Sequence, residues 1–156
     1  MTNFKKVTGT WHGTYSYDPL EHIPKLDPIP FTLILKQGWF GRFTGKVSDG
    51  PGGMPDTGAI KGRFSFPRIA FTKQMPVFYV VMPDRRNISL RQFLLELGET
   101  CEHEIPHPPI FYTGEFSDDR HAKGTWIIRA EEHPLSDGRA VPLFEASGVW
   151  RIEKIG

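Results

Sequence analysis

The chain of 156 residues is long enough to form one domain that buries most of its apolar surface without disulfides or metals. Its 19 lysines and arginines nearly balance 18 aspartates and glutamates, and because the two signs are interspersed we expect no nucleic-acid-binding stripe. The single cysteine excludes an intramolecular disulfide. We expect neither a signal peptide nor a membrane span, because no apolar stretch is long enough, and so predict one cytoplasmic domain over 1–156.

Alternation of apolar and polar residues runs through most of the chain and predicts half-buried β-strands. Glycine often stands two residues before an aromatic, as at Gly9 and Trp11 or Gly124 and Trp126, so that both lie on one face of a strand. Turn-forming residues separate these segments, and short connections favour antiparallel neighbours. In chain order, the predicted strands are 7–17, 31–36, 39–48, 57–66, 68–74, 76–82, 109–117, 122–130 and 143–154.

One segment has a helical period instead of a strand period. Apolar residues at helical spacing predict a short helix over 89–97, with Ser89 and Gln92 as a capping pair and Gly98 as its stop. Two proline-rich segments, 18–30 and 101–109, follow no regular pattern and are predicted to be long ordered loops.

The glycines on the apolar strand faces favour a closed barrel. A glycine inside a strand costs roughly 0.5–1 kcal/mol relative to alanine, so its repeated use needs a geometric reason. Inward glycines relieve crowding where strands bend across a small barrel, and neighbouring aromatics fill the space that they leave. We predict a mainly β fold, an antiparallel meander β-barrel of about eight to ten strands with one short inserted helix. A two-sheet sandwich is the alternative.

The first predicted strand resembles that of the calycins, the group of meander barrels that includes lipocalins and avidins. Gly9-Thr10-Trp11 is similar to the G-x-W motif that opens lipocalins, and the longer TGTWHG is similar to the first strand of avidin-type barrels. The resemblance implies that Arg151, in the last strand, covers Trp11. The chain departs from lipocalins in lacking a long C-terminal helix, and the biotin contacts of avidins find no matching positions.

The predicted inward face of the strands supplies the candidate ligand-binding residues. This face is aromatic apart from one charge, Lys73, which either fixes a carboxylate ligand or runs its stem to solvent at a strand end; we favour the second. Asp49, followed by Gly50, is assigned to a turn. The candidate ligand-binding residues are Trp11, Tyr15, Trp39, Phe43, Lys73, Tyr79, Tyr112 and Trp126.

The stretch from His103 to His107 has the letters of the H-E-x-x-H zinc-protease helix. Pro106 removes a backbone donor inside the required helix, so the two histidines cannot be held one helical turn apart. A loop metal site that adds Glu102 or Glu104 is a weaker alternative. We therefore predict no metal ligand and no catalytic residue, and the sequence indicates no cofactor.

Three functions are compatible with this sequence. The leading hypothesis is non-catalytic binding of a small apolar or planar molecule inside the barrel, by analogy with the fold. The second is a packed barrel that serves as an interaction or structural module, with 18–30 and 101–109 as its contact surface; a filled interior would favour it. The third is an enzyme of unrecognised type that uses the loop histidines. A homo-oligomer is neither required nor excluded.

Overall fold

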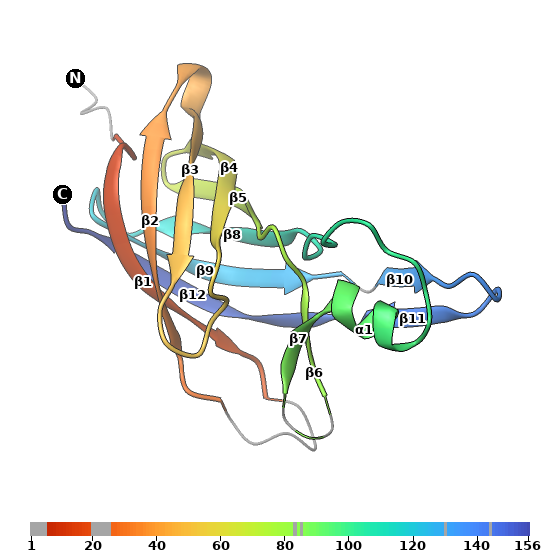
Figure 1. The fold of residues 1–156 in the computed structure, drawn as a ribbon. Helices are drawn as coiled ribbons and strands as arrows, with labels where there is room; N and C mark the ends of the chain where they lie inside the picture. Colours follow the sequence, from red (N-terminus) through yellow and green to blue (C-terminus); the bar gives the residue numbers. More distant parts are fainter. Residues whose placement is uncertain (1–5, 20–25, 83, 85, 130, 144) are drawn as a thin grey trace.

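The computed structural model describes residues 6–19, 26–82, 84, 86–129, 131–143 and 145–156. Eight antiparallel strands close into a barrel in the order β1-β12-β9-β8-β5-β4-β3-β2 (Figure 1). The predicted antiparallel barrel is confirmed, and the sandwich alternative is wrong. The barrel strands are β1 (Gly9–Tyr17), β2 (Ile29–Gln37), β3 (Arg42–Asp49), β4 (Thr57–Ser65), β5 (Arg68–Gln74), β8 (Ile110–Phe116), β9 (His121–Ile128) and β12 (Ala146–Lys154).

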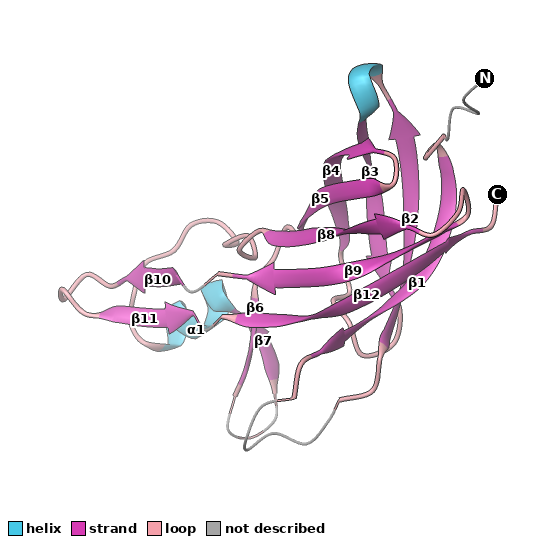
Figure 2. Ribbon diagram, turned by 180° about the vertical axis from the view of Figure 1, so that it is seen from behind, coloured by secondary structure: helices cyan, strands magenta, loops and turns pink. Residues whose placement is uncertain are grey.

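The two ends of the barrel differ, because the connections of an antiparallel meander alternate between them. One end carries only the short connections 38–41, 66–67 and 117–120, and we call it the turn end. The other end carries the loop 50–56 and the long connections 75–109 and 129–145, and we call it the loop end. Most added structure in Figure 2 therefore lies beyond one end of the barrel.

The long connections form a small second unit beyond the loop end. It consists of the hairpin β6 (Tyr79–Val81) and β7 (Asn87–Ser89), the helix α1 (Leu90–Glu96), and the hairpin β10 (Glu131–Pro134) and β11 (Ala140–Leu143). Leu90 and Leu94 of α1 pack with Leu143 in a core separate from that of the barrel. The predicted helix is confirmed, since the Ser89 hydroxyl accepts a hydrogen bond of 3.1 Å from the backbone nitrogen of Gln92.

Several predicted boundaries differ from the structure for local reasons. β2 begins at Ile29 and includes Pro30 near its start, where a missing backbone donor is tolerated. β3 begins at Arg42, because Trp39–Gly41 form a 3-10 turn, η1, in which Phe40 has φ 57° and ψ 38°. β7, β10 and β11 are too short to show a period in the sequence.

The barrel interior is a continuous apolar core in which glycine and aromatic side chains alternate. Gly124 faces Trp150 on one neighbouring strand and Gly114 on the other, and the Trp150 ring lies against this glycine pair. The Trp150 indole nitrogen crosses them to donate to the carbonyls of Thr113 and Thr125, at 3.1 and 3.0 Å. The glycines thus allow the strands to approach closely, and the tryptophan covers the gap.

We predict that Gly124→Ala destabilises the barrel by about 1–3 kcal/mol, the usual cost of overpacking a core. The added methyl group would collide with the Thr113 carbonyl oxygen, which belongs to a paired strand and cannot move independently. Urea unfolding followed by far-UV circular dichroism measures the change. Gly38→Ala is the control, since its methyl group would meet only the Arg42 carbonyl oxygen at 3.7 Å. Equal effects of the two substitutions would contradict this account of barrel closure.

Candidate functional site

The structure brings six of the eight candidate ligand-binding residues together inside the barrel. All six are buried, and they belong to one core cluster or lie within it. The five aromatic members contact neighbouring rings, as Tyr15 does edge to face against Trp126 at 6.1 Å between ring centroids. The six are Trp11, Tyr15, Phe43, Lys73, Tyr112 and Trp126.

The inward positions predicted for Trp39 and Tyr79 are wrong. Trp39 is 84% exposed in η1, because the turn interrupts the alternation that continues from β3. Tyr79 lies on β6, which pairs with β7 outside the barrel, and its hydroxyl donates to Asp56 at 2.9 Å. An alternating pattern predicts a strand but does not show which sheet the strand joins.

An ion pair between Lys73 and Asp49 is buried in the loop end of the barrel. The Nζ of Lys73 lies 2.7 Å from Oδ1 of Asp49, and the two side chains are 1% and 0% exposed. The other carboxylate oxygen accepts hydrogen bonds from the Tyr15 hydroxyl at 2.8 Å and from the backbone nitrogen of Met54 at 3.0 Å. Met54 belongs to the loop 50–56, so the ion pair also anchors that loop.

This arrangement overturns two predictions. Lys73 does not run to solvent, and Asp49 is more than a turn residue. The alternation of inward Phe43, Gly45 and Val47 in β3 continues to Asp49 and places its side chain in the interior. The neighbouring Gly50 favours a turn, and a turn assignment does not indicate that the Asp49 side chain points inward.

The pKa values of the groups in this cluster are shifted by burial and by the Asp49 carboxylate. Burial, together with the Asp49 carboxylate, raises the pKa of the Tyr15 hydroxyl, which therefore stays protonated and donates. Burial lowers the pKa of the Lys73 ammonium, and the adjacent carboxylate opposes that change. The ammonium also lies 4.5 Å from the centre of the Tyr15 ring. Within the cluster, the Lys73 ammonium and the Tyr15 hydroxyl both have the Asp49 carboxylate as their partner.

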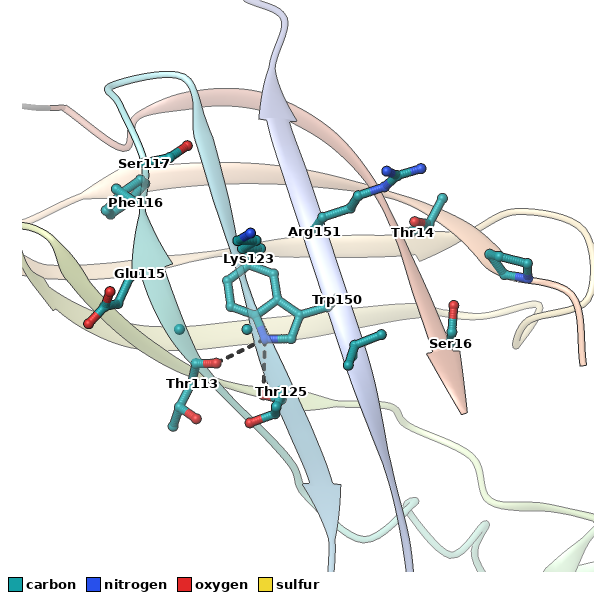
Figure 3. Close-up of a pocket in the computed structure, with 14 residues that line it drawn as sticks. Thr14, Ser16, Thr113, Glu115, Phe116, Ser117, Lys123, Thr125, Trp150 and Arg151 are labelled. Carbon is teal, nitrogen blue, oxygen red and sulfur yellow. Dashed lines mark hydrogen bonds between the residues drawn. The ribbon is translucent and has the colours of Figure 1, made fainter. Parts of the chain in front are cut away.

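Three hollows on the described surface lie on the outside of the barrel. The first, of about 750 Å³, lies across β1, β12, β9 and β8 (Figure 3). Its rim is formed by outward hydroxyl and charged side chains, and its floor by the backbone of Gly114 and Gly124, with Trp150 beneath. A third hollow, of about 580 Å³, adjoins it near His12 and His121. Both mix cations with carboxylates, so neither favours one sign of charge.

Arg151 stands on the rim of the first hollow and not over Trp11. Its side chain is exposed on the outward face of β12, opposite Thr14 and Lys123. The indole nitrogen of Trp11 instead donates to the Val7 carbonyl at 2.8 Å. The role that the lipocalin resemblance implied for Arg151 is therefore wrong.

The second hollow lies on a face whose charged side chains on β2 to β5 are all positive; Glu115 of the adjoining strand β8 stands opposite Arg68 at its edge. It has a volume of about 610 Å³, spans β3, β4, β5 and β8, and is lined by Arg42, Lys61 and Arg63. The outward side chains of β2, β3, β4 and β5, all of them described, include no aspartate or glutamate. We call this surface the basic face; its cations are Lys36, Arg42, Lys46, Lys61, Arg63 and Arg68.

The loop histidines do not form a metal site within the described residues. The segment 101–109 contains no helix, as its prolines predict. His107 is buried and its Nδ1 lies 2.6 Å from the Pro108 carbonyl, whereas His103 is exposed. Burial lowers the pKa of the His107 imidazole, which favours the neutral ring. Among the described side chains, no group of three or more His, Cys, Asp or Glu residues is arranged to hold a metal ion.

No family model, curated protein or solved structure matches this chain. The eight-stranded antiparallel barrel agrees with what the calycin resemblance implies, and membership of that group stays a prediction. In the described part of the chain, no helix has the length and apolar character that crossing a membrane requires.

We predict that Asp49→Asn destabilises the protein by about 3–5 kcal/mol, because it leaves the Lys73 ammonium buried without its counter-charge. The double variant Asp49→Asn, Lys73→Met removes both charges and should recover a large part of that loss. Urea unfolding of the wild type, both single variants and the double variant completes the cycle. Additive effects of the two substitutions would show that the charges contribute independently.

Proposed function

We propose that this protein is a non-catalytic binding module that contacts an anionic partner through the basic face. The observation that carries the proposal is the opposition of Arg42 and Arg63, direct partners in the register of β3 and β4, on strands whose outward side chains include no carboxylate. Lys123 and Arg151 also stand opposite each other, but there Glu115 stands on the other side of Lys123. Like charges in directly opposed positions of a sheet destabilise it. An anion between them would relieve this repulsion, so the face is suited to a negatively charged ligand.

The surroundings of the arginine pair support the same conclusion. Lys61 stands opposite Thr44 in the same register, and both line the second hollow with Thr72. Guanidinium groups bind carboxylates and phosphates in a bidentate fashion, and threonine hydroxyls add further hydrogen bonds. No carboxylate of the described residues lies within 4 Å of these three cations as an ion-pair partner. The positive charge is therefore available to a partner.

We predict that wild-type protein is retained on a heparin column and that Arg42→Gln, Arg63→Gln elutes at clearly lower salt. The control is Lys123→Gln, Arg151→Gln, which removes two exposed cations from the strands β9 and β12 and so has the same net charge. The control should elute close to the wild type. If both double variants elute together, net charge and not the basic face governs retention, and the proposal fails.

The barrel interior is a second candidate site, favoured by the buried cluster of Asp49, Lys73 and Tyr15. Burying a charged pair in an apolar core costs desolvation free energy. A small molecule bound beneath the loop 50–56 would give the pair a role in ligand binding. Such a ligand must displace Met54, whose side chain packs against the core. The packed interior therefore makes this the second choice.

Native mass spectrometry of freshly purified protein, before and after denaturation, tests the interior site. If the interior carries a ligand, the folded protein has a stoichiometric organic adduct that denaturation releases, and Lys73→Met lowers its occupancy. A mass equal to that of the chain alone, unchanged after exposure to a lipid and metabolite extract, would count against an interior ligand.

A further inference from the structure

The hairpin between β2 and β3 carries two aromatic side chains into solvent. Trp39 is 84% and Phe40 is 89% exposed, more than any other large hydrophobic side chain of the described residues. Neither ring takes part in a ring–ring contact within the described part of the chain. η1 projects beyond the neighbouring strands at the turn end (Figure 1), and we call this projecting turn the apex.

The backbone of the hairpin fixes the exposed position of Trp39 and Phe40. Phe40 has a left-handed conformation, with φ 57° and ψ 38°, which is unfavourable for a bulky residue. Gly41 follows with φ 73° and lies against the Phe64 carbonyl so closely that a Cβ would not fit. Because the turn is held against β4, the exposure of the rings does not result from a loose loop.

The cations nearest to the apex form a rim behind it. Lys36 and Arg42 flank the turn on β2 and β3, and Arg63 and Arg68 flank the neighbouring turn 66–67 on β4 and β5. All four side chains are exposed. Along the outside of the barrel, the aromatic residues therefore lie at the apex and the positive charges follow behind them.

We propose that the apex of Trp39 and Phe40 inserts into the interface of an anionic membrane while the rim of cations contacts the lipid head groups. Aromatic side chains, tryptophan above all, favour the membrane–water interface, and lysine and arginine next to the surface bind acidic lipids. This inference rests on the proposed function, since it names the anionic partner of the basic face.

The arrangement favours a membrane over single-stranded nucleic acid. Nucleic-acid platforms place aromatic rings among the cations, so that bases stack while phosphates are neutralised. Here the outward positions between the cations of β3 to β5 are small, with Thr44, Ala59, Ala70 and Thr72. Two further rings border this face but are already engaged, Phe66 stacked on Phe116 and Phe111 against Arg129. The most exposed rings, Trp39 and Phe40, lie in the turn beyond the cations. In a lipid interface, aromatic side chains lie deeper than the cations that contact the head groups. The apex and the cations behind it have this same order.

The test is co-sedimentation with vesicles of equimolar phosphatidylcholine and phosphatidylglycerol and with vesicles of phosphatidylcholine alone. We expect wild-type protein to bind the anionic vesicles in a salt-sensitive way and the neutral ones at least tenfold more weakly. Trp39→Ser, Phe40→Ser should bind the anionic vesicles at least tenfold more weakly than wild type. The matched control is Ile127→Ser, Val149→Ser, which removes two exposed apolar side chains from β9 and β12 and should bind normally.

Tryptophan fluorescence gives an independent reading of insertion. The other three tryptophans, Trp11, Trp126 and Trp150, are at most 2% exposed, so a blue shift or quenching by brominated lipid reports Trp39. Circular dichroism of each variant confirms that it is folded, which is expected because every substituted side chain is exposed.

The outcomes separate this inference from the proposed function. If the Trp39 and Phe40 variant binds like wild type while Arg42→Gln, Arg63→Gln loses binding, insertion is overturned and the basic face stands. If oligodeoxythymidine binds and quenches Trp39 while vesicles do not bind, the membrane inference is overturned in favour of nucleic acid. If neither vesicles nor heparin bind in a way that depends on the basic face, both proposals fail.

Discussion

The fold depends on the close approach of strands at inward glycines. Eight strands can close into a small barrel only if the sheet coils strongly, and Gly114, Gly124 and Gly148 stand where any larger side chain would strike the backbone of the next strand. The space that they leave is covered by large rings, as when Trp126 reaches the Ser16 carbonyl across Gly148. Filling the interior in this way moves the surface available for binding to the outside of the barrel.

Much of the fold follows from a two-residue period, and the errors have physical causes. Alternation places the barrel strands and the inward aromatic residues correctly, and Ser89 marks the start of the helix. It misplaces Trp39, because a single left-handed residue at Phe40 replaces the expected start of β3 by a turn. It misplaces Tyr79, because periodicity is a local property and the choice of sheet is not.

The proposed binding surfaces also could not be predicted in full from local sequence patterns. The alternation in the sequence predicts that Lys73 points inward. The same alternation also places its partner Asp49 inward, but the assignment of Asp49 to a turn prevents this prediction. The basic face is invisible to a count of charges along the chain, since the cations are dispersed over 36–68 and the total charge is only +1. It arises when four consecutive strands turn their outward positions to the same side. Charge segregation is thus a property of topology here, not of composition.

The pairing of β1 with β12 constrains how the chain reaches its native state. Thr14 meets Arg151 and Tyr15 meets Trp150, contacts between the opposite ends of the sequence. Such long-range pairings slow folding, because the entropy of closing the intervening chain is lost before the contacts repay it. During synthesis, β1 to β9 can form hairpins in turn, but both edges of the sheet stay open until residues 146–154 have left the ribosome. The last strand therefore closes the barrel. Only after it pairs with β1 and β9 are the exposed strand edges, which could pair with other chains and aggregate, covered.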